Sequence, residues 1–268
     1  MGAAAALCLA LLAAAPAEGE EAKSTALYST VDHHGRVELD VSSTKARVPS
    51  VTFEHWRHRA LYTCRVCHVD LGFAMKAGET QVSAASNEAG QHCGACHDGK
   101  RLHEGRPIFK ACAGWPRADP TRGCTRCHTG ASRGADPAYE AFKASMPLDV
   151  AGYVDWAAAM RRGLVKPVDA VEGISPKRAP LRVDRDVQIR PLGTWMNGVT
   201  FSHRKHVAWI SCELCHPDVF PMSRRDSVRY EMASMRSGRA CGACHLTVAF
   251  PLGTCSRCHG VEDGRAVR

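Results

Sequence analysis

The feature that most constrains this chain is a five-residue motif, Cys-x-x-Cys-His, which occurs six times. A cysteine pair with this spacing is compatible with a zinc ribbon, a redox dithiol or an iron–sulfur cluster. None of these sites, and no disulfide framework, explains why His follows every pair. With 14 His in 268 residues, chance would place His after all six pairs on the order of once in 10⁷ sequences or fewer. The six motifs are Cys64/Cys67/His68, Cys93/Cys96/His97, Cys124/Cys127/His128, Cys212/Cys215/His216, Cys241/Cys244/His245 and Cys255/Cys258/His259.

This motif is the attachment signature of c-type haem. Two thiols on one tight turn can each form a thioether to one edge of a porphyrin, and the next side chain is then held beneath the iron. We therefore predict six covalent haem c groups, each attached through two motif cysteines and ligated by the motif His.

Haem, rather than a large apolar core, is expected to organise this chain. Each haem is served by about 42 residues of mature chain, and segments below roughly 40 residues seldom fold without metals, disulfides or other staples. We predict a mostly α fold with extensive irregular structure around the haems. The apoprotein is expected to be largely unfolded.

The first 17 residues are interpreted as a secretory signal peptide. An apolar stretch from Ala3 to Ala15 runs into a small-residue cleavage site that ends at Ala17, and acidic residues follow. The stretch is shorter than the roughly 20 residues that a spanning helix requires. The mature protein is therefore expected in the periplasm or outside the cell, without a transmembrane segment.

The chain also contains an internal repeat. The stretch VTFEHWRHRALYTCRVCH at 51–68 is identical to VTFSHRKHVAWISCELCH at 199–216 at nine of eighteen positions. Each stretch carries two His three residues apart before a haem motif, and the next motif in both copies reads CGACH. On a helix, side chains three residues apart project about 60° from each other, so one helix can ligate two adjacent haems. The paired residues are His55, His58, His203 and His206.

The third motifs break the offset of 148 residues that relates the two copies. The first copy has a 17-residue insertion between its second and third motifs. This insertion contains His103 and the unpaired Cys112. We expect Cys112 to be a buried thiol.

The order of these motifs resembles the triheme "c-seven" (class III) cytochromes and the tandem triheme domains of nanowire-type multihaem cytochromes. The resemblance rests on F-x-H-x-x-H, C-x-x-C-H, a Met-bearing segment before C-G-x-C-H, and a third C-x-x-C-H, within 51–130 and 199–260. It implies two tandem triheme domains, each a small helical and loop-rich fold around three closely packed haems. It also implies the axial pairs His55 with His68, His58 with His97, His203 with His216 and His206 with His245.

The distal ligand of the third haem differs between the copies. In the second copy, the resemblance implies that Met235 or Met232 is this ligand, although both could pack against porphyrin without touching iron. The aligned positions of the first copy are Ala84 and Asn87, so the haem of His128 lacks a Met there. Its candidate ligands are His103, His92, His33, His34 and Met75, and an open coordination site is the alternative.

The segments outside the repeats are assigned from their composition. The polar N-terminal segment is expected to hold a strand or short hairpin, and an amphipathic helix between the repeats is expected to face inward with Trp156 and Met160. A basic, proline-containing stretch follows this helix. The predicted organisation is 1–17 signal peptide, 18–50 N-terminal segment, 51–130 first triheme domain, 131–198 linker with one helix, and 199–268 second triheme domain.

The net charge of +8 does not indicate nucleic-acid binding. Each ferric haem with two ionised propionates adds about −1, so six haems bring the protein close to about +2. The excess of Lys and Arg is therefore expected to neutralise propionates.

The sequence thus predicts a hexahaem cytochrome that passes single electrons between redox partner proteins, such as other cytochromes or respiratory complexes. One alternative is a nitrite or hydroxylamine reductase, which would need an open haem site. Because no C-x-x-C-K variant or other catalytic constellation occurs, we predict an electron-transfer protein and not an enzyme. A second alternative is a haem-bearing structural subunit of a larger respiratory complex.

Overall fold

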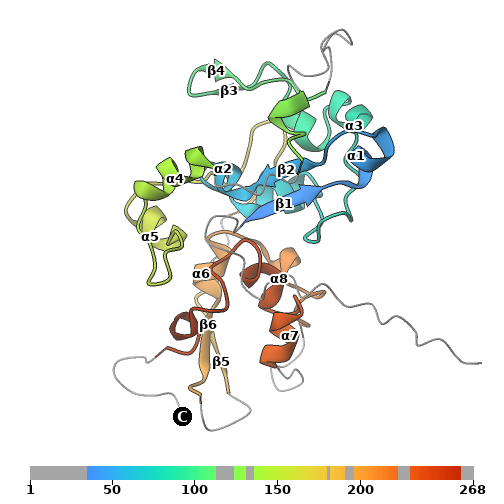
Figure 1. Ribbon diagram of the computed structural model, residues 1–268. Coiled ribbons are helices and arrows are strands. Elements are labelled where there is room, and N and C mark those ends of the chain that lie inside the picture. The colour runs from blue at the N-terminus through green and yellow to red at the C-terminus, as the bar shows by residue number, and fades with distance from the viewer. Residues whose placement is uncertain are drawn as a thin grey trace, which may run out of the picture.

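The computed structural model describes residues 35–112, 124–130, 136–179, 182–190, 196–222 and 230–260. Short helices joined by irregular segments make up most of this part of the chain, together with two-stranded sheets (Figure 1). The α-helices are α1 (Val41–Ala46), α2 (His55–Arg59), α3 (Ala84–Glu88), α4 (Pro137–Ala144), α5 (Trp156–Arg161), α6 (His203–Val207), α7 (Met232–Arg236) and α8 (Gly242–His245). The strands are β1 (Arg36–Leu39), β2 (Val51–Glu54), β3 (Leu102–His103), β4 (Arg106–Pro107), β5 (Asp186–Ile189) and β6 (Val199–Ser202).

Most of the haem motifs lie in 3₁₀-helices or in a π-helix and not in α-helices. One is the π-helix η1 (Val66–Asp70), and the 3₁₀-helices are η2 (His92–Ala95), η3 (Cys124–Arg126), η4 (Cys212–Leu214) and η6 (Cys255–Arg257). A helical but largely irregular fold was predicted from the motif density, and the structure confirms it.

Each repeat begins with a two-stranded antiparallel sheet. In the first repeat Val37 on β1 lies opposite Phe53 on β2, and in the second Val187 on β5 lies opposite Phe201 on β6. β2 and β6 are the V-T-F segments of the repeated motif, whereas β1 and β5 come from segments outside it. The structural repeat is therefore longer than the sequence repeat, and β5 lies in the stretch that was predicted as a linker.

The phenylalanine of each F-x-H-x-x-H motif orients both histidines that follow it. The ring of Phe53 stacks on His58 at 4.6 Å and meets His55 edge-on at 4.8 Å. Phe201 stacks on His206 at 4.3 Å in the same way. α2 and α6 begin directly after the strand, at the first His of each pair, so the helix predicted for these pairs is confirmed.

Helices α3 and α7 occupy equivalent places and pack against the glycine of a CGACH motif. A Cβ atom at Gly94 would lie 1.9 Å from the carbonyl oxygen of Asn87, and one at Gly242 would lie 1.8 Å from that of Met235. Such distances leave no room for a side chain, so this backbone approach requires glycine. The glycine fixes how closely the helix lies over the haem motif.

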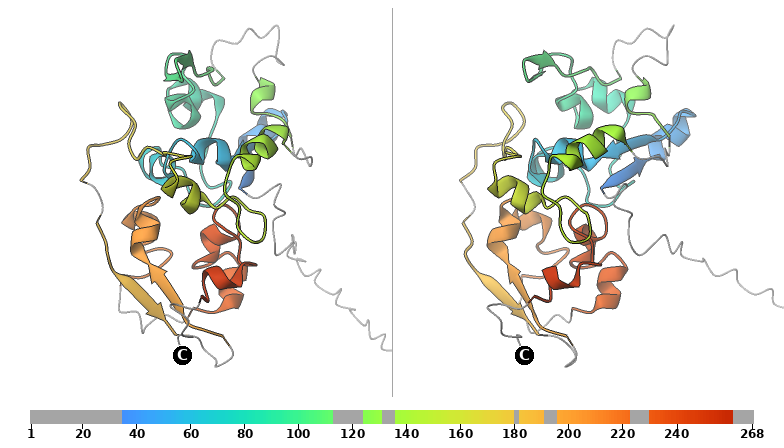
Figure 2. Two further views of the ribbon diagram at one scale, coloured as in Figure 1. Left: turned by 90° about the vertical axis from the view of Figure 1, so that its left-hand side faces the viewer. Right: turned by 60° about the vertical axis from the view of Figure 1, so that its left-hand side comes forward.

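The two repeats pack against each other through the first haem motif. The backbone N–H of Cys64 donates to the carbonyl oxygen of Trp209 at 3.0 Å. Arg65, which is 2% exposed, donates to the carbonyl oxygen of Ile210 at 3.2 Å and forms an ion pair with Asp169 of the connecting segment. Figure 2 shows the repeats stacked, with the connecting helices beside the junction.

Helices α4 and α5 cover this junction with aromatic rings. Trp56 lies 4.9 Å from Phe142, which lies 5.5 Å from Trp156. The buried residues of α5 are Ala158 and Ala159, whereas Trp156 and Met160 are only half-buried. Trp156, which starts α5, faces the junction and packs against Phe142 and Arg59.

Few apolar side chains are buried in the part of the chain that the structure describes. Eight hydrophobic residues there are buried, and three of them are alanines. A protein of this size ordinarily builds a larger interior. The small core agrees with the expectation that cofactors complete it.

Candidate haem sites

Each Cys-x-x-Cys-His motif forms one tight turn. In five of the six motifs the backbone N–H of the His donates to the carbonyl oxygen of the first cysteine, at 2.7–3.0 Å. The remaining motif lies at η1. All twelve motif cysteines are free of disulfides. The turn keeps both thiols and the imidazole close together, as attachment to one porphyrin edge requires.

Backbone carbonyls fix the imidazole rings of the motif and paired histidines. Nδ1 of nine of these ten residues lies 2.6–3.5 Å from a backbone carbonyl oxygen. A carbonyl oxygen only accepts, so Nδ1 carries the proton and Nε2 keeps its lone pair. This is the tautomer that binds a metal through Nε2, and the carbonyl raises its basicity. The nine are His55, His58, His68, His128, His203, His206, His216, His245 and His259.

The rings of two predicted axial pairs have similar separations in the two repeats, with interplanar angles of 62° and 67°. The ring centroids of His58 and His97 are 6.2 Å apart, and those of His206 and His245 are 6.4 Å apart. Metal–imidazole bonds of about 2.0 Å place two ring centroids on opposite sides of one ion about 6 Å apart. The side chains therefore fit an iron that each pair shares.

Burial keeps these imidazoles neutral. It lowers the pKa of His55, His58 and His245 from 6.5 to about 4, against the opposing effect of the carbonyl partners. Burial also lowers the pKa of His68, His97 and His206. A neutral imidazole is the form that binds a metal.

The motif thiols lie in equally apolar surroundings. Burial raises the pKa of Cys67 to about 12, and that of Cys93, Cys244 and Cys258 to about 11. Such surroundings disfavour a thiolate. A thioether carries no charge, so covalent attachment of haem suits these positions.

The third motifs of the two repeats have equivalent proximal surroundings. Nδ1 of His128 lies 2.7 Å from the carbonyl oxygen of Pro49, and Nδ1 of His259 lies 2.6 Å from that of Asn197. Pro49 and Asn197 are 148 residues apart, like the paired histidines. The sixth motif is therefore the counterpart of the third.

The residues near the third motif that could supply a distal ligand differ between the two repeats, as the sequence indicates. Met232 and Met235 lie on α7, and both are half-buried. Their counterparts on α3 are Ala84 and Asn87. Cys112 is exposed, which corrects the expectation of a buried thiol, because its segment crosses the surface beside α3. Its Sγ lies 3.6 Å from Nδ2 of Asn87.

The candidate distal ligands for the haem of His128 are scattered. His103 lies on the exposed hairpin of β3 and β4, and Met75 is 38% exposed. Nδ1 of His92 lies 3.3 Å from the hydroxyl of Ser86. His33 and His34 lie outside the described residues.

Arg59 is a candidate functional residue that the sequence repeat does not reveal. Its counterpart in the second copy is Val207. Burial lowers the pKa of Arg59 to about 10. Its charge in turn lowers the pKa of groups in two different haem sites, namely His55, Cys64, Cys244 and His245.

The profile of the family described as "Cytochrome c7 and related cytochrome c" matches residues 51–129 and 199–260, which is more than half of the chain. This chain belongs to the cytochrome c7 family. It is a multihaem c-type cytochrome that binds haem c covalently and transfers electrons, and these predictions from the sequence are confirmed.

Solved structures of multihaem cytochromes are also similar to this member of the cytochrome c7 family. The C-terminal hexaheme fragment of a dodecaheme cytochrome c is 23% identical, covers 85% of this chain and 98% of its own, and has a TM-score of 0.26. A c7-type three-heme cytochrome domain is 30% identical over 31% of this chain and 99% of its own, with a TM-score of 0.26. The N-terminal hexaheme fragment is 22% identical over 84% and 98%, with a TM-score of 0.24.

No curated protein gives a match to this cytochrome. Among its described residues, none of the helices is long and apolar enough to cross a membrane.

Proposed function

We propose that this cytochrome binds six haems and carries single electrons along them in the periplasm or at the cell surface. The observation that carries the proposal is the separation of the His58–His97 and His206–His245 rings, 6.2 and 6.4 Å, at equivalent places in the two repeats. Because each repeat contains an equivalent pair of histidines, we infer that each repeat forms the same kind of three-haem unit.

The axial ligands follow from the repeat. His58 and His97 would hold one iron, and His206 and His245 would hold its counterpart. The first sites of the repeats would be held by His55 with His68 and by His203 with His216. The haem of His259 would take Met235 or Met232, whereas the haem of His128 would take one of His103, His33, His34, His92 and Met75 or stay open.

The protein itself keeps the histidine ligands neutral, oriented and shielded from water. The carbonyl partners of Nδ1 set the tautomer and raise the basicity of Nε2, and burial disfavours protonation. Haem supplies a reversible one-electron change at iron, and its potential depends on the axial ligand and on nearby charge. A Met ligand raises the potential relative to His. Unequal ligation would therefore spread the haems of this chain over a range of potentials.

The number of haems can be counted directly. We expect the purified mature protein to start at Glu18 and to carry six haems that acid and organic solvent do not extract. Intact mass spectrometry measures both quantities. Cys112→Ser is the matched control, because Cys112 belongs to no motif and its loss should leave six haems. Five or fewer haems on a fully matured sample would reject the hexahaem assignment.

A further inference from the structure

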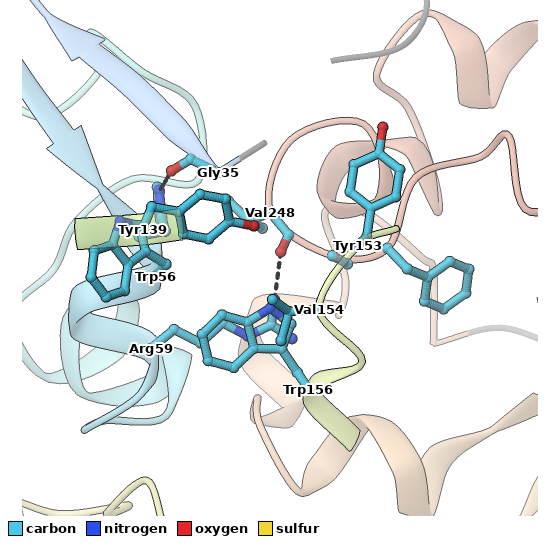
Figure 3. Close-up of a pocket in the computed structure, with 11 residues that line it drawn as sticks. Gly35, Trp56, Arg59, Tyr139, Tyr153, Val154, Trp156 and Val248 are labelled. Carbon is cyan, nitrogen blue, oxygen red and sulfur yellow. Dashed lines mark hydrogen bonds between the residues drawn. The ribbon is translucent and has the colours of Figure 1, made fainter. Parts of the chain in front are cut away.

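Arg59 joins the two repeats at their junction. It is the last residue of α2, and its Nη1 donates to the carbonyl oxygen of Val248 in the second repeat at 2.5 Å. Its guanidinium lies over the ring of Trp156 at 4.6 Å and over that of Trp209 at 4.9 Å. Figure 3 shows Arg59 beside the ring of Trp156, with its hydrogen bond to Val248 drawn dashed, and all three residues line this cavity.

The charge of Arg59 is not neutralised by a carboxylate within the described ranges. Arg57 on the same helix is paired with Asp136, and Arg257 is paired with Asp149. The Nε atom of Arg59 is buried without a hydrogen-bond partner. Two aromatic faces and one carbonyl hold this guanidinium, and none of these partners carries a negative charge.

This charge lies between one haem motif of each repeat. Trp209, beneath the guanidinium, accepts the N–H of Cys64 at 3.0 Å. Val248, which accepts from Arg59, donates its own N–H to the carbonyl oxygen of Cys244 at 3.0 Å.

We propose that Arg59 is a positioning charge shared by the haem of Cys64/Cys67 and the haem of Cys241/Cys244, and that electrons cross between the repeats at this pair of haems. This inference rests on the proposed function. A positive charge in a poorly solvated site stabilises the ferrous form, which has one positive charge less than the ferric form, and so raises both reduction potentials. Each crossing moves one electron, oxidising the iron of one site and reducing that of the other, with no proton or co-reactant.

The test is a redox titration of the full-length haem-loaded protein, with the haem methyl resonances followed by NMR so that each haem is resolved. Arg59→Met keeps the length of the side chain and removes its charge. It should lower the potentials of the two haems at Cys64/Cys67 and Cys241/Cys244 and leave the other four unchanged. Arg59→Lys keeps the charge and should keep both potentials. Arg57→Met is the matched control on the same helix and should shift neither of these two potentials, because Arg57 is paired with Asp136.

A purely structural role predicts a different pattern. If Arg59→Lys lowers the two potentials as much as Arg59→Met does, the packing of the guanidinium and not its charge is responsible, and the inference is overturned. Unchanged potentials in Arg59→Met would overturn it as well. Arg59→Gln provides a second neutral variant that can still donate to Val248 if the methionine variant does not mature.

The wild-type protein supplies a comparison that needs no variant. The haem of Cys64/Cys67 and its counterpart at Cys212/Cys215 have the same proposed ligand types, but Val207 stands in place of Arg59 in the second repeat. The first of these haems should have the higher potential, and an equal or lower value contradicts the inference. A sample without six covalent haems would instead reject the proposed function, so the two failures are distinguishable.

Discussion

The imidazole rings of His206 and His245 lie 6.4 Å apart, although 39 residues separate them in the sequence. His206 reaches this position from α6, where Phe201 stacks on its ring and the carbonyl of Ser202 accepts from its Nδ1 at 2.8 Å. His245 ends α8, and the carbonyl of Phe250 holds its Nδ1 at 2.8 Å. Each ring is therefore oriented by contacts within its own segment, independently of a shared iron.

Substitution of His206 tests this pair. His206→Ala should make one iron high-spin while the other irons stay as they are, because the remaining ligands belong to other sites. Electron paramagnetic resonance of the oxidised protein measures the change. Lys205→Ala, at the exposed neighbouring position, is the control and should leave the spectrum unaltered. A spectrum that His206→Ala does not change would show that the repeat-based ligand assignment is wrong.

Helix α7 offers two candidate sulfur ligands for the haem of His259. If Met235 binds this iron, Met235→His should lower the potential of one haem, because a Met ligand raises the potential relative to His. Met232→His is the matched control on the same helix. A shift in the control alone would assign the ligand to Met232. No shift in either variant would mean that both methionines only pack against the porphyrin.

The local parts of these sites could be predicted from the sequence. The motif cysteines, the paired histidines and the helix of each pair depend on spacing within a few residues, which the chain displays directly. The pairing of β5 with β6 could not be predicted, because β1 (RVEL) and β5 (DVQI) are identical only at Val and do not follow the 148-residue offset of the repeat. Arg59 escaped prediction for a similar reason. Its importance depends on Trp209 and Val248, which lie in the other repeat.

The glycine of each CGACH motif has a packing requirement that the sequence repeat alone does not explain. Gly242→Ala should lower the free energy of unfolding by about 1–3 kcal/mol, because the new Cβ must displace the backbone of α7. Thermal or denaturant unfolding of the haem-loaded protein measures this cost. Gly242 does not have a positive φ, so this loss measures the contact with α7 and not strain of a left-handed backbone. Unchanged stability in Gly242→Ala would contradict the packing explanation.

The depressed pKa values of the buried imidazoles make stability depend on pH. His55, His58 and His245 take up protons at pH 6.5 in the unfolded chain but only near pH 4 in the folded one. Stability should therefore fall as the pH falls from 6.5 to 4, by about 1.4 kcal/mol per pH unit for each imidazole. Iron ligation acts in the same direction, because a ligating nitrogen cannot bind a proton.

Denaturant unfolding at pH 7 and pH 5 measures this dependence, together with proton uptake on unfolding at pH 5. Equal stability at the two pH values would show that these imidazoles are accessible to protons in the folded protein.

Carbon monoxide distinguishes a chain of saturated haems from a reductase with an open site. If every iron has two protein ligands, the reduced protein should bind carbon monoxide slowly, or at far below one equivalent per molecule. Small redox dyes should still reduce and reoxidise it over a broad range of potentials, because electron transfer between packed haems requires no ligand exchange. Nitrite and hydroxylamine should not be turned over.

The haem of His128 decides how such a result is interpreted, because it is the haem for which an open coordination site is the alternative. Rapid binding of one equivalent of carbon monoxide together with turnover of nitrite or hydroxylamine would reject the carrier function and locate an active site at this haem. Binding without turnover would show only that the sixth ligand there is weak or absent. His103→Ala then tests one candidate directly: it should raise the bound fraction if His103 is that ligand, and leave it unchanged otherwise.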